Sequence, residues 1–167
     1  MSRSTRTLRL AGLLGLIIAG NAVAETAITA KDAQAILAEH NRIRAEVEVP
    51  PLAWSDTVAD GAQRWADKLA QSCELKHNAL SRYGQNLFMG TDGYYGVRDA
   101  ALNWEEEKSQ YHGGRITAEN WHPSGHYTQM VWRLTQRLGC GKAICRGQVI
   151  VVCDYDPRGN ILNQPPY

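Results

Sequence analysis

The hydrophobic positions of the chain recur with helical spacing in three segments. In residues 30–47, 55–71 and 97–111, apolar side chains return every three or four positions, as on one face of a helix. Thr29 precedes the first segment and Ser55 opens the second, and both residue types favour the start of a helix. We therefore predict three amphipathic helices over these segments, each with one face packed on a core.

The spacing changes to that of strands over residues 138–155. Two β-prone runs there flank Arg146-Gly147, which predicts a two-residue hairpin turn. In that register Cys140 lies opposite Cys153 in a non-hydrogen-bonded pair, whose Cα atoms are ~4.5 Å apart. Because this separation falls at the close end of the disulfide range, we predict a bridge between these two cysteines.

The second run of the hairpin is apolar on both of its alternating faces, from Val149 to Val152. A strand of this kind is covered on both sides. Together with the helices it predicts an α+β fold, a three-layer α-β-α sandwich with a central antiparallel sheet. Residues 73–95, which are rich in Gly, Asn and Tyr, are predicted to form a loop.

The first 24 residues differ in kind from the rest. They contain three arginines and no acid, then an apolar run over 10–20, and they close with Ala22-Val23-Ala24. This order is typical of a secretory signal with an A-x-A cleavage site, so we predict a signal peptide over 1–24 and a single domain over 25–167. The apolar run has 11 residues, short of the ~20 that a membrane-spanning helix needs, and no transmembrane anchor is expected.

Removal of that segment changes the charge. The whole chain has a formal net charge of +1, but from Glu25 onward 15 Lys and Arg residues face 17 Asp and Glu residues. Such a domain lacks the concentrated basic face that nucleic acid requires, so no nucleic-acid partner is expected. All four cysteines lie here, and export favours two disulfides over buried free thiols. The hairpin bridge leaves Cys73 and Cys145 for the second.

Candidate chemistry lies in His77-Asn78, in Gln85-Asn86 and in residues 124–132. None of these matches a hydrolase elbow, a P-loop or an H-E-x-x-H helix. Of three consecutive glutamates in the third predicted helix, only Glu107 is placed to look inward, about 50° from the centre of the apolar stripe.

The remaining histidines are less informative. His40 lies on the apolar face of the first predicted helix, where we expect a packing histidine. His112 and His122 stand beside glycine and proline, and we expect both to be exposed, with His122 able to reach the rim of a cleft.

Several long, ordered motifs between residues 36 and 167 match one known family. They are residues 125–132, 152–160, 83–87 and 104–108, His77-Asn78, His40-Asn41-x-x-Arg44 and Leu52-Ala53-Trp54. On these motifs the chain resembles the CAP superfamily of cysteine-rich secretory proteins, antigen 5 and pathogenesis-related class 1 proteins, and most of all the plant class 1 branch. The resemblance implies the same sandwich fold and the same two cysteine pairings.

The resemblance also implies a central cleft. By motif position its residues are His77, Gln85, Glu107 and His126, with Gln85 where glutamate is common. In many members the two histidines hold a divalent cation, so His77 and His126 are expected to bind zinc or magnesium weakly. Two neutral imidazoles plus water form an open zinc site. The alternatives are an inert hydrogen-bonded cluster and a true catalytic centre.

Two departures from the family pattern concern the C-terminal half. Ser124 stands where members have a cysteine of a third disulfide, so we expect a more mobile loop over 112–124. Asp154 replaces the asparagine of the usual C-N-Y motif. The end of the chain, from Pro157 to Tyr167, looks like the peptide released from plant class 1 proteins, and its Pro and Gly predict an exposed loop.

The resemblance favours a secreted, non-enzymatic binding module, a monomer that binds sterol or fatty acid or meets a host or extracellular partner. Aromatic residues in the loops predicted over 88–96 and 111–124 would supply apolar surface for such a ligand. The alternatives are a precursor of the C-terminal signalling peptide and a cation-dependent hydrolase that uses His77, His126 and Glu107. The arginines of the signal and the absence of N-x-S/T sequons favour a bacterial source, with export to the periplasm or the medium.

Overall fold

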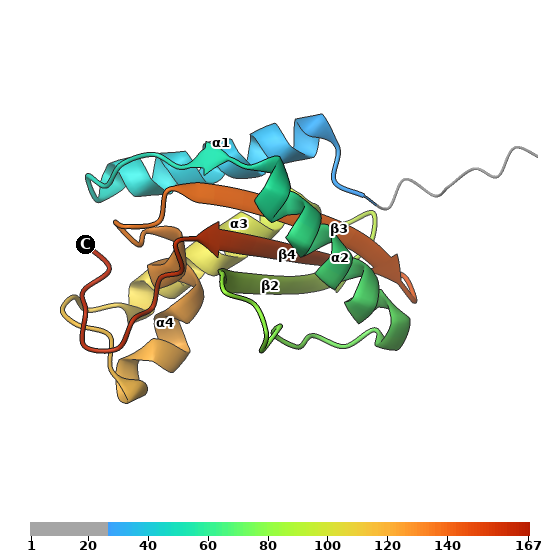
Figure 1. Ribbon diagram of the computed structural model, residues 1–167. Helices are drawn as coiled ribbons and strands as arrows, with labels where there is room; N and C mark the ends of the chain where they lie inside the picture. The colour runs from blue at the N-terminus through green and yellow to red at the C-terminus, as the bar shows by residue number, and fades with distance from the viewer. Residues whose placement is uncertain (1–26) are drawn as a thin grey trace, which may run out of the picture.

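A computed structural model describes residues 27–167 (Figure 1). The signal peptide predicted over 1–24 lies outside the described residues. The elements follow in the order α1 (Ala30–Glu46), β1 (Ala53–Trp54), α2 (Asp56–Ser72), β2 (Gly84–Thr91), α3 (Val97–Glu106), the 3₁₀ helix η1 (Glu107–Gln110), α4 (Ala118–Met130), β3 (Arg137–Cys145) and β4 (Gln148–Asp156).

The three predicted helices are confirmed, and local signals account for their starts. The hydroxyl of Thr29 accepts from the Asp32 N–H, and the hydroxyl of Ser55 accepts from the Val58 N–H. The third helix is shorter than predicted, because α3 ends at Glu106 and its last turn continues as η1. Glu107 therefore begins a 3₁₀ turn, which directs its side chain differently from a continued α-helix.

The sheet has the strand order β1-β3-β4-β2 within the described residues. β3 pairs antiparallel with β4, as predicted, and β2 pairs antiparallel with the other edge of β4, which was not predicted. The two-residue β1 adds a parallel edge beside β3, so the sheet is mixed. The hairpin register is confirmed, with Cys140 opposite Cys153 and Cys145 opposite Gln148.

The sheet is covered on both faces, which confirms the three-layer sandwich. Alternate β4 residues point to opposite sides, so Val149 and Val151 join the core under α1, α3 and α4, while Ile150 and Val152 join the core under α2. Figure 1 shows α2 crossing one face of the sheet, with α3 behind it.

Two glycines of β3 let α2 lie unusually close to the sheet. A Cβ atom on Gly139 would overlap the α2 backbone at Ala59, and one on Gly141 would overlap it at Gln63. This close approach brings Gly61, which lies between those two positions, near the end of β4, where a Cβ on it would come within 3.8 Å of Asp154 Oδ2.

Both disulfides are present in the structure. Cys140–Cys153 joins the two strands of the hairpin, with Cα atoms 4.1 Å apart, slightly closer than the expected separation. Cys73–Cys145, with a Cα separation of 5.6 Å, ties the end of α2 to the tip of β3. Together the two bridges tie the strands of the hairpin to each other and the hairpin to the end of α2.

Two predicted loops are wrong in part. Residues 84–91, inside the loop predicted over 73–95, form β2 and pair along their whole length with β4. Residues 118–130 form α4, although Pro123 lies inside it and the loop was predicted to reach 124. Tertiary pairing and a capping box between Thr117 and Asn120 outweigh the weak local propensities of these two segments.

The tail is packed against the domain, so the exposed loop predicted from Pro157 onward is wrong in part. Gly159 and Pro166 are buried. The Arg133 N–H donates to the Pro166 carbonyl at 2.7 Å, and Ile116 exchanges backbone hydrogen bonds with Asn163 and Gln164. Within residues 27–167, none of the helices is both long and apolar enough to cross a membrane.

Candidate functional site: a two-histidine pocket

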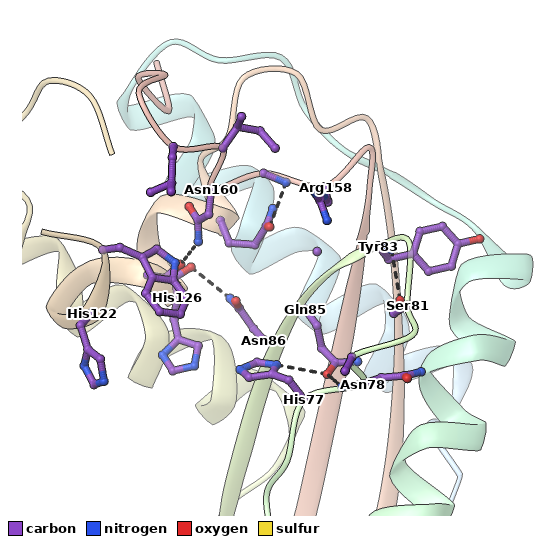
Figure 2. A pocket seen from close by; sticks show the side chains of 18 residues that line it. His77, Asn78, Ser81, Tyr83, Gln85, Asn86, His122, His126, Arg158 and Asn160 are labelled. Atoms are coloured by element: carbon purple, nitrogen blue, oxygen red, sulfur yellow. Dashed lines mark hydrogen bonds between the residues drawn. The ribbon is translucent and has the colours of Figure 1, made fainter. Parts of the chain in front are cut away.

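A cavity of about 880 Å³ lies where the start of β2, the middle of α4 and the tail meet. Figure 2 shows the side chains that line it. Its polar wall contains His77, Gln85, Asn86 and His126, and its apolar wall contains Trp121, Ile161 and Leu162. Trp121 and Leu162 remain 45% and 59% exposed, so apolar surface is open beside the histidines.

His126 comes from α4 and is held by a carboxylate. Glu107 Oε1 lies 2.6 Å from His126 Nδ1, and Glu107 Oε2 accepts from the backbone N–H groups of His126 and Tyr127 at 2.7 and 3.3 Å. Because an ionised carboxylate only accepts, Nδ1 carries the ring proton in the neutral imidazole and Nε2 is left bare. Trp104 stacks on the ring, with centroids 6.1 Å apart.

His77 comes from the segment before β2 and is held by an amide. Gln85 Oε1 accepts from the Asn78 N–H at 3.0 Å and lies 3.2 Å from His77 Nδ1 (Figure 2). The other end of the same amide, Nε2, donates to Asp154 Oδ1 at 2.8 Å. This orientation makes Nδ1 the donor of His77 and leaves its Nε2 bare as well.

Asp154 lies behind this amide, directly opposite Gln85 in the pairing of β2 with β4. Its side chain is buried, with 3% of the residue exposed. Burial raises the pKa of Asp154 to about 6, and the hydrogen bond from Gln85 partly offsets that rise. At neutral pH the group is therefore mainly a carboxylate held in a poorly solvated place.

A buried hydrogen-bonded chain supports the floor of the pocket. Asn86 Nδ2 donates to the His126 carbonyl and to the Tyr155 hydroxyl, both at 3.0 Å. The Tyr155 hydroxyl lies 2.8 Å from His40 Nε2, and His40 Nδ1 lies 2.7 Å from the Ile36 carbonyl. Burial lowers the pKa of His40 to about 4, so the ring is neutral. Its Nδ1–H then donates to the Ile36 carbonyl, and its Nε2 accepts from the Tyr155 hydroxyl. His40 is the packing histidine that was predicted.

The tail forms the wall opposite β2. Asn160 Nδ2 donates to the Gly125 carbonyl at 2.7 Å, and Thr128 Oγ1 donates to Asn160 Oδ1 at 2.8 Å. The Gly159 N–H donates to Gln129 Oε1 at 3.0 Å. These bonds hold Gly159 and Asn160 against α4, the helix that carries His126.

The structure brings His77, Gln85 and His126 into one pocket wall, while Glu107 stands behind His126. His122 is exposed at the rim and His112 is exposed away from it. Across residues 27–167, no group of three or more His, Cys, Asp or Glu side chains is arranged to hold a metal. A cation here would have two protein ligands and water.

Sequence reasoning missed the roles of several residues at this site. Asp154 was noted only as a departure from a motif and Asn160 only as part of a longer motif, while Asn86 was named as a candidate without a role. The alternation of β4 could have placed Asp154 on the α2 face with Ile150 and Val152. Its contact with Gln85 was not predictable, because β2 was taken for a loop.

An α-β-α sandwich with two disulfides and a two-histidine pocket defines the class of this protein. The chain belongs to the CAP family: the profile of the "Cysteine-rich secretory protein family" matches residues 37–155. It is 42% identical over 135 residues to pathogenesis-related protein 1C of Nicotiana tabacum, covering 80% of each chain. It is also 42% identical over 136 residues to pathogenesis-related protein 1 of Arabidopsis thaliana, covering 80% of this chain and 81% of that one.

Solved structures agree with the fold. A crystal structure of NaASP2 with Zn²⁺ has a TM-score of 0.71 at 26% identity, covering 84% of this chain and 86% of that one. A structure of BmVAL-1 has a TM-score of 0.68 at 22% identity, covering 83% and 82%. The sequence and fold comparisons therefore agree on a CAP domain related to plant pathogenesis-related class 1 proteins.

Proposed function

We propose that the protein is an exported, non-enzymatic binding module. Its pocket holds a divalent cation weakly between His77 and His126 and takes an apolar ligand, of the sterol or fatty-acid class, along Trp121 and Leu162. The observation that carries the proposal is the junction of the two walls, because two imidazoles with bare Nε2 atoms line the same pocket as open apolar surface.

The donor set fits a weak cation site. Neutral imidazole nitrogens bind zinc well, and each ring here has its Nδ1 atom hydrogen-bonded to protein, which orients the ring and raises its basicity. A cation held by His77 and His126 would supply positive charge at the polar end of the pocket. The crystal structure of NaASP2 with Zn²⁺ supports the choice of metal.

The composition of the wall favours binding over hydrolysis. Among the described residues, none of the side chains that line the pocket is a carboxylate. Glu107 is fully used by His126 and two backbone N–H groups, and Asp154 is covered by Gln85. A carboxylate base would have to lie within hydrogen-bond reach of the attacking water, and the two imidazoles, which could also act as bases, are assigned to the cation in this proposal.

Zinc titration calorimetry on the purified protein tests the cation site. We expect saturable binding that weakens about tenfold or more when His77→Ala or His126→Ala removes a ligand. His112→Ala removes an exposed histidine outside the pocket, so it is the matched control and should bind as the wild type does. Equal affinity in all four proteins would refute the site.

The same samples test the apolar ligand. A fluorescent fatty acid and a fluorescent sterol should bind saturably at micromolar protein, and Trp121→Ala should weaken that binding. Absence of saturation for both probes, with and without zinc, would refute this part of the proposal.

Export is supported by the signal-like residues 1–24, by the two disulfides and by the family. The mass of the secreted protein tests it, because that mass gives the position of the processed N-terminus.

A further inference from the structure

Asp154 is a buried acid, and the packing around it does not explain why the residue is charged. The residue is 3% exposed, and a Cβ on Gly61 of α2 would lie 3.8 Å from its Oδ2 atom. Its hydrogen-bond partner is the neutral amide of Gln85. A buried carboxylate is unfavourable unless a cation or several donors compensate it. A neutral asparagine could accept the same bond from Gln85. The charge therefore calls for a reason beyond stability.

The direction of the hydrogen bonds supplies that reason. A carboxylate only accepts, so Asp154 requires the NH₂ end of Gln85 to face it. The carbonyl end of Gln85 then faces the Asn78 N–H and the His77 ring. Since that oxygen also only accepts, His77 must donate from Nδ1, and the unprotonated nitrogen is Nε2.

We infer that Asp154 is a positioning residue: together with the Asn78 N–H it holds Gln85 in the orientation that fixes the tautomer of His77, and it keeps the carboxylate charge one side chain away from that ring. The inference rests on the proposed function in one respect, since the bared Nε2 atom is the cation ligand. It deepens that function by naming what sets the affinity. Strand pairing carries it: Gln85 and Asp154 are direct partners in β2 and β4.

An exchange of the two groups would move the charge without changing the number of polar atoms. In Gln85→Glu with Asp154→Asn, the amide lies on β4 and the carboxylate contacts His77 and the Asn78 N–H. The ring still donates from Nδ1, now to a charged acceptor, which makes Nε2 a stronger ligand. With Gln85→Glu alone, two carboxylates would meet where the 2.8 Å bond now lies, and they would share a proton.

The test compares the wild type with Asp154→Asn, Gln85→Glu and the double exchange at pH 7.5. The ¹⁵N signals of the His77 ring, recorded without metal, report the tautomer, and zinc calorimetry reports affinity. We expect a single Nδ1–H tautomer in the wild type and in the double exchange. In Asp154→Asn we expect a minor second tautomer, because an asparagine can accept or donate and the Asn78 N–H alone then orients the Gln85 amide. Asp154→Asn should weaken zinc binding about threefold, and the double exchange should tighten it about tenfold.

Asp60→Asn is the matched control, because it removes an exposed charge from α2 and should change neither signal. An unchanged tautomer and affinity in Asp154→Asn would overturn the inference, and so would a Gln85→Glu protein that binds zinc as tightly as the double exchange. If the wild type binds no zinc, the proposed cation site fails, while the metal-free ¹⁵N signals still decide the role of Asp154.

Discussion

His126 and His77 reach the same pocket from different elements, and an oxygen acceptor lies beside Nδ1 of each ring. For His126 the acceptor is the carboxylate of Glu107, which also binds two backbone N–H groups of α4. For His77 it is the amide of Gln85, and the nearest carboxylate of that half, Asp154, lies behind the amide. The rings are thus oriented alike but differ in the charge at their backs.

The difference shows that ligand identity alone does not define this site. A carboxylate on the Nδ1–H of a histidine makes the ring a stronger ligand, and a neutral amide does so less. His126 is therefore expected to be the principal ligand and His77 the weaker partner. The carboxylate of Glu107 contacts its ring directly, whereas that of Asp154 is one side chain away from His77, so the two histidines should differ in affinity for a cation.

The largest effect is expected from breaking the His126 half. Glu107→Ala removes a charged acceptor of three hydrogen bonds, and we expect the free energy of unfolding to fall by about 3 kcal/mol. Zinc affinity should fall by about 10- to 100-fold. Urea denaturation and calorimetry measure the two losses. Glu106→Ala removes the exposed neighbouring acid, and a similar loss in that protein would contradict the assignment to Glu107.

A second prediction uses pH to separate the effect of Asp154, which lies behind His77, from that of the buried His40. The pKa of His40 is lowered to about 4, so the unfolded chain takes up its proton first on acidification, and stability is lost between pH 6.5 and 4. The pKa of Asp154 is raised to about 6, so the folded chain takes up its proton first, and stability is gained from pH 6 downward.

The two effects oppose each other in the wild type, and Asp154→Asn removes only the gain. That variant should therefore lose about 2 kcal/mol more unfolding free energy than the wild type between pH 7 and pH 4. Urea titrations at both pH values measure the difference. Parallel pH profiles for the two proteins would show that Asp154 is not a carboxylate in a poorly solvated place.

The smallest effect is expected at the rim. His122 lines the pocket edge but is exposed, and its side chain makes no hydrogen bond to another residue of 27–167. We expect His122→Ala to change zinc affinity by less than about twofold and the unfolding free energy by less than about 0.5 kcal/mol. A larger loss of affinity in calorimetry would make His122 a third ligand and contradict a site built from His77 and His126 alone.

Local patterns were sufficient for much of the fold. The periodicity of α1, α2 and α3 follows from which side chains each helix buries, and the Cys140–Cys153 bridge follows from the register of one hairpin. These features depend on residues near one another in the sequence. The resemblance then located His77, Gln85, Glu107 and His126, although not their contacts.

The rest depends on partners far apart in the chain. β2 contains few β-branched residues and is a strand because β4 pairs with it. The paired residues are between 57 positions apart, at Thr91 and Gln148, and 71 positions apart, at Gly84 and Tyr155. α4 contains Pro123 and Gly125, which disfavour helix, but its cap and packing hold it. Asp154 could be assigned a role only after both strands were in register.

The packed tail has a consequence for the use of the chain as a precursor. A protease that released the segment from Pro157 to Tyr167 would remove Gly159 and Asn160 from α4 and Leu162 from the apolar wall. A free peptide and an intact pocket therefore cannot come from the same molecule. Cleavage would therefore open the pocket irreversibly, and a ligand bound along its apolar wall would lose the surface that Leu162 supplies.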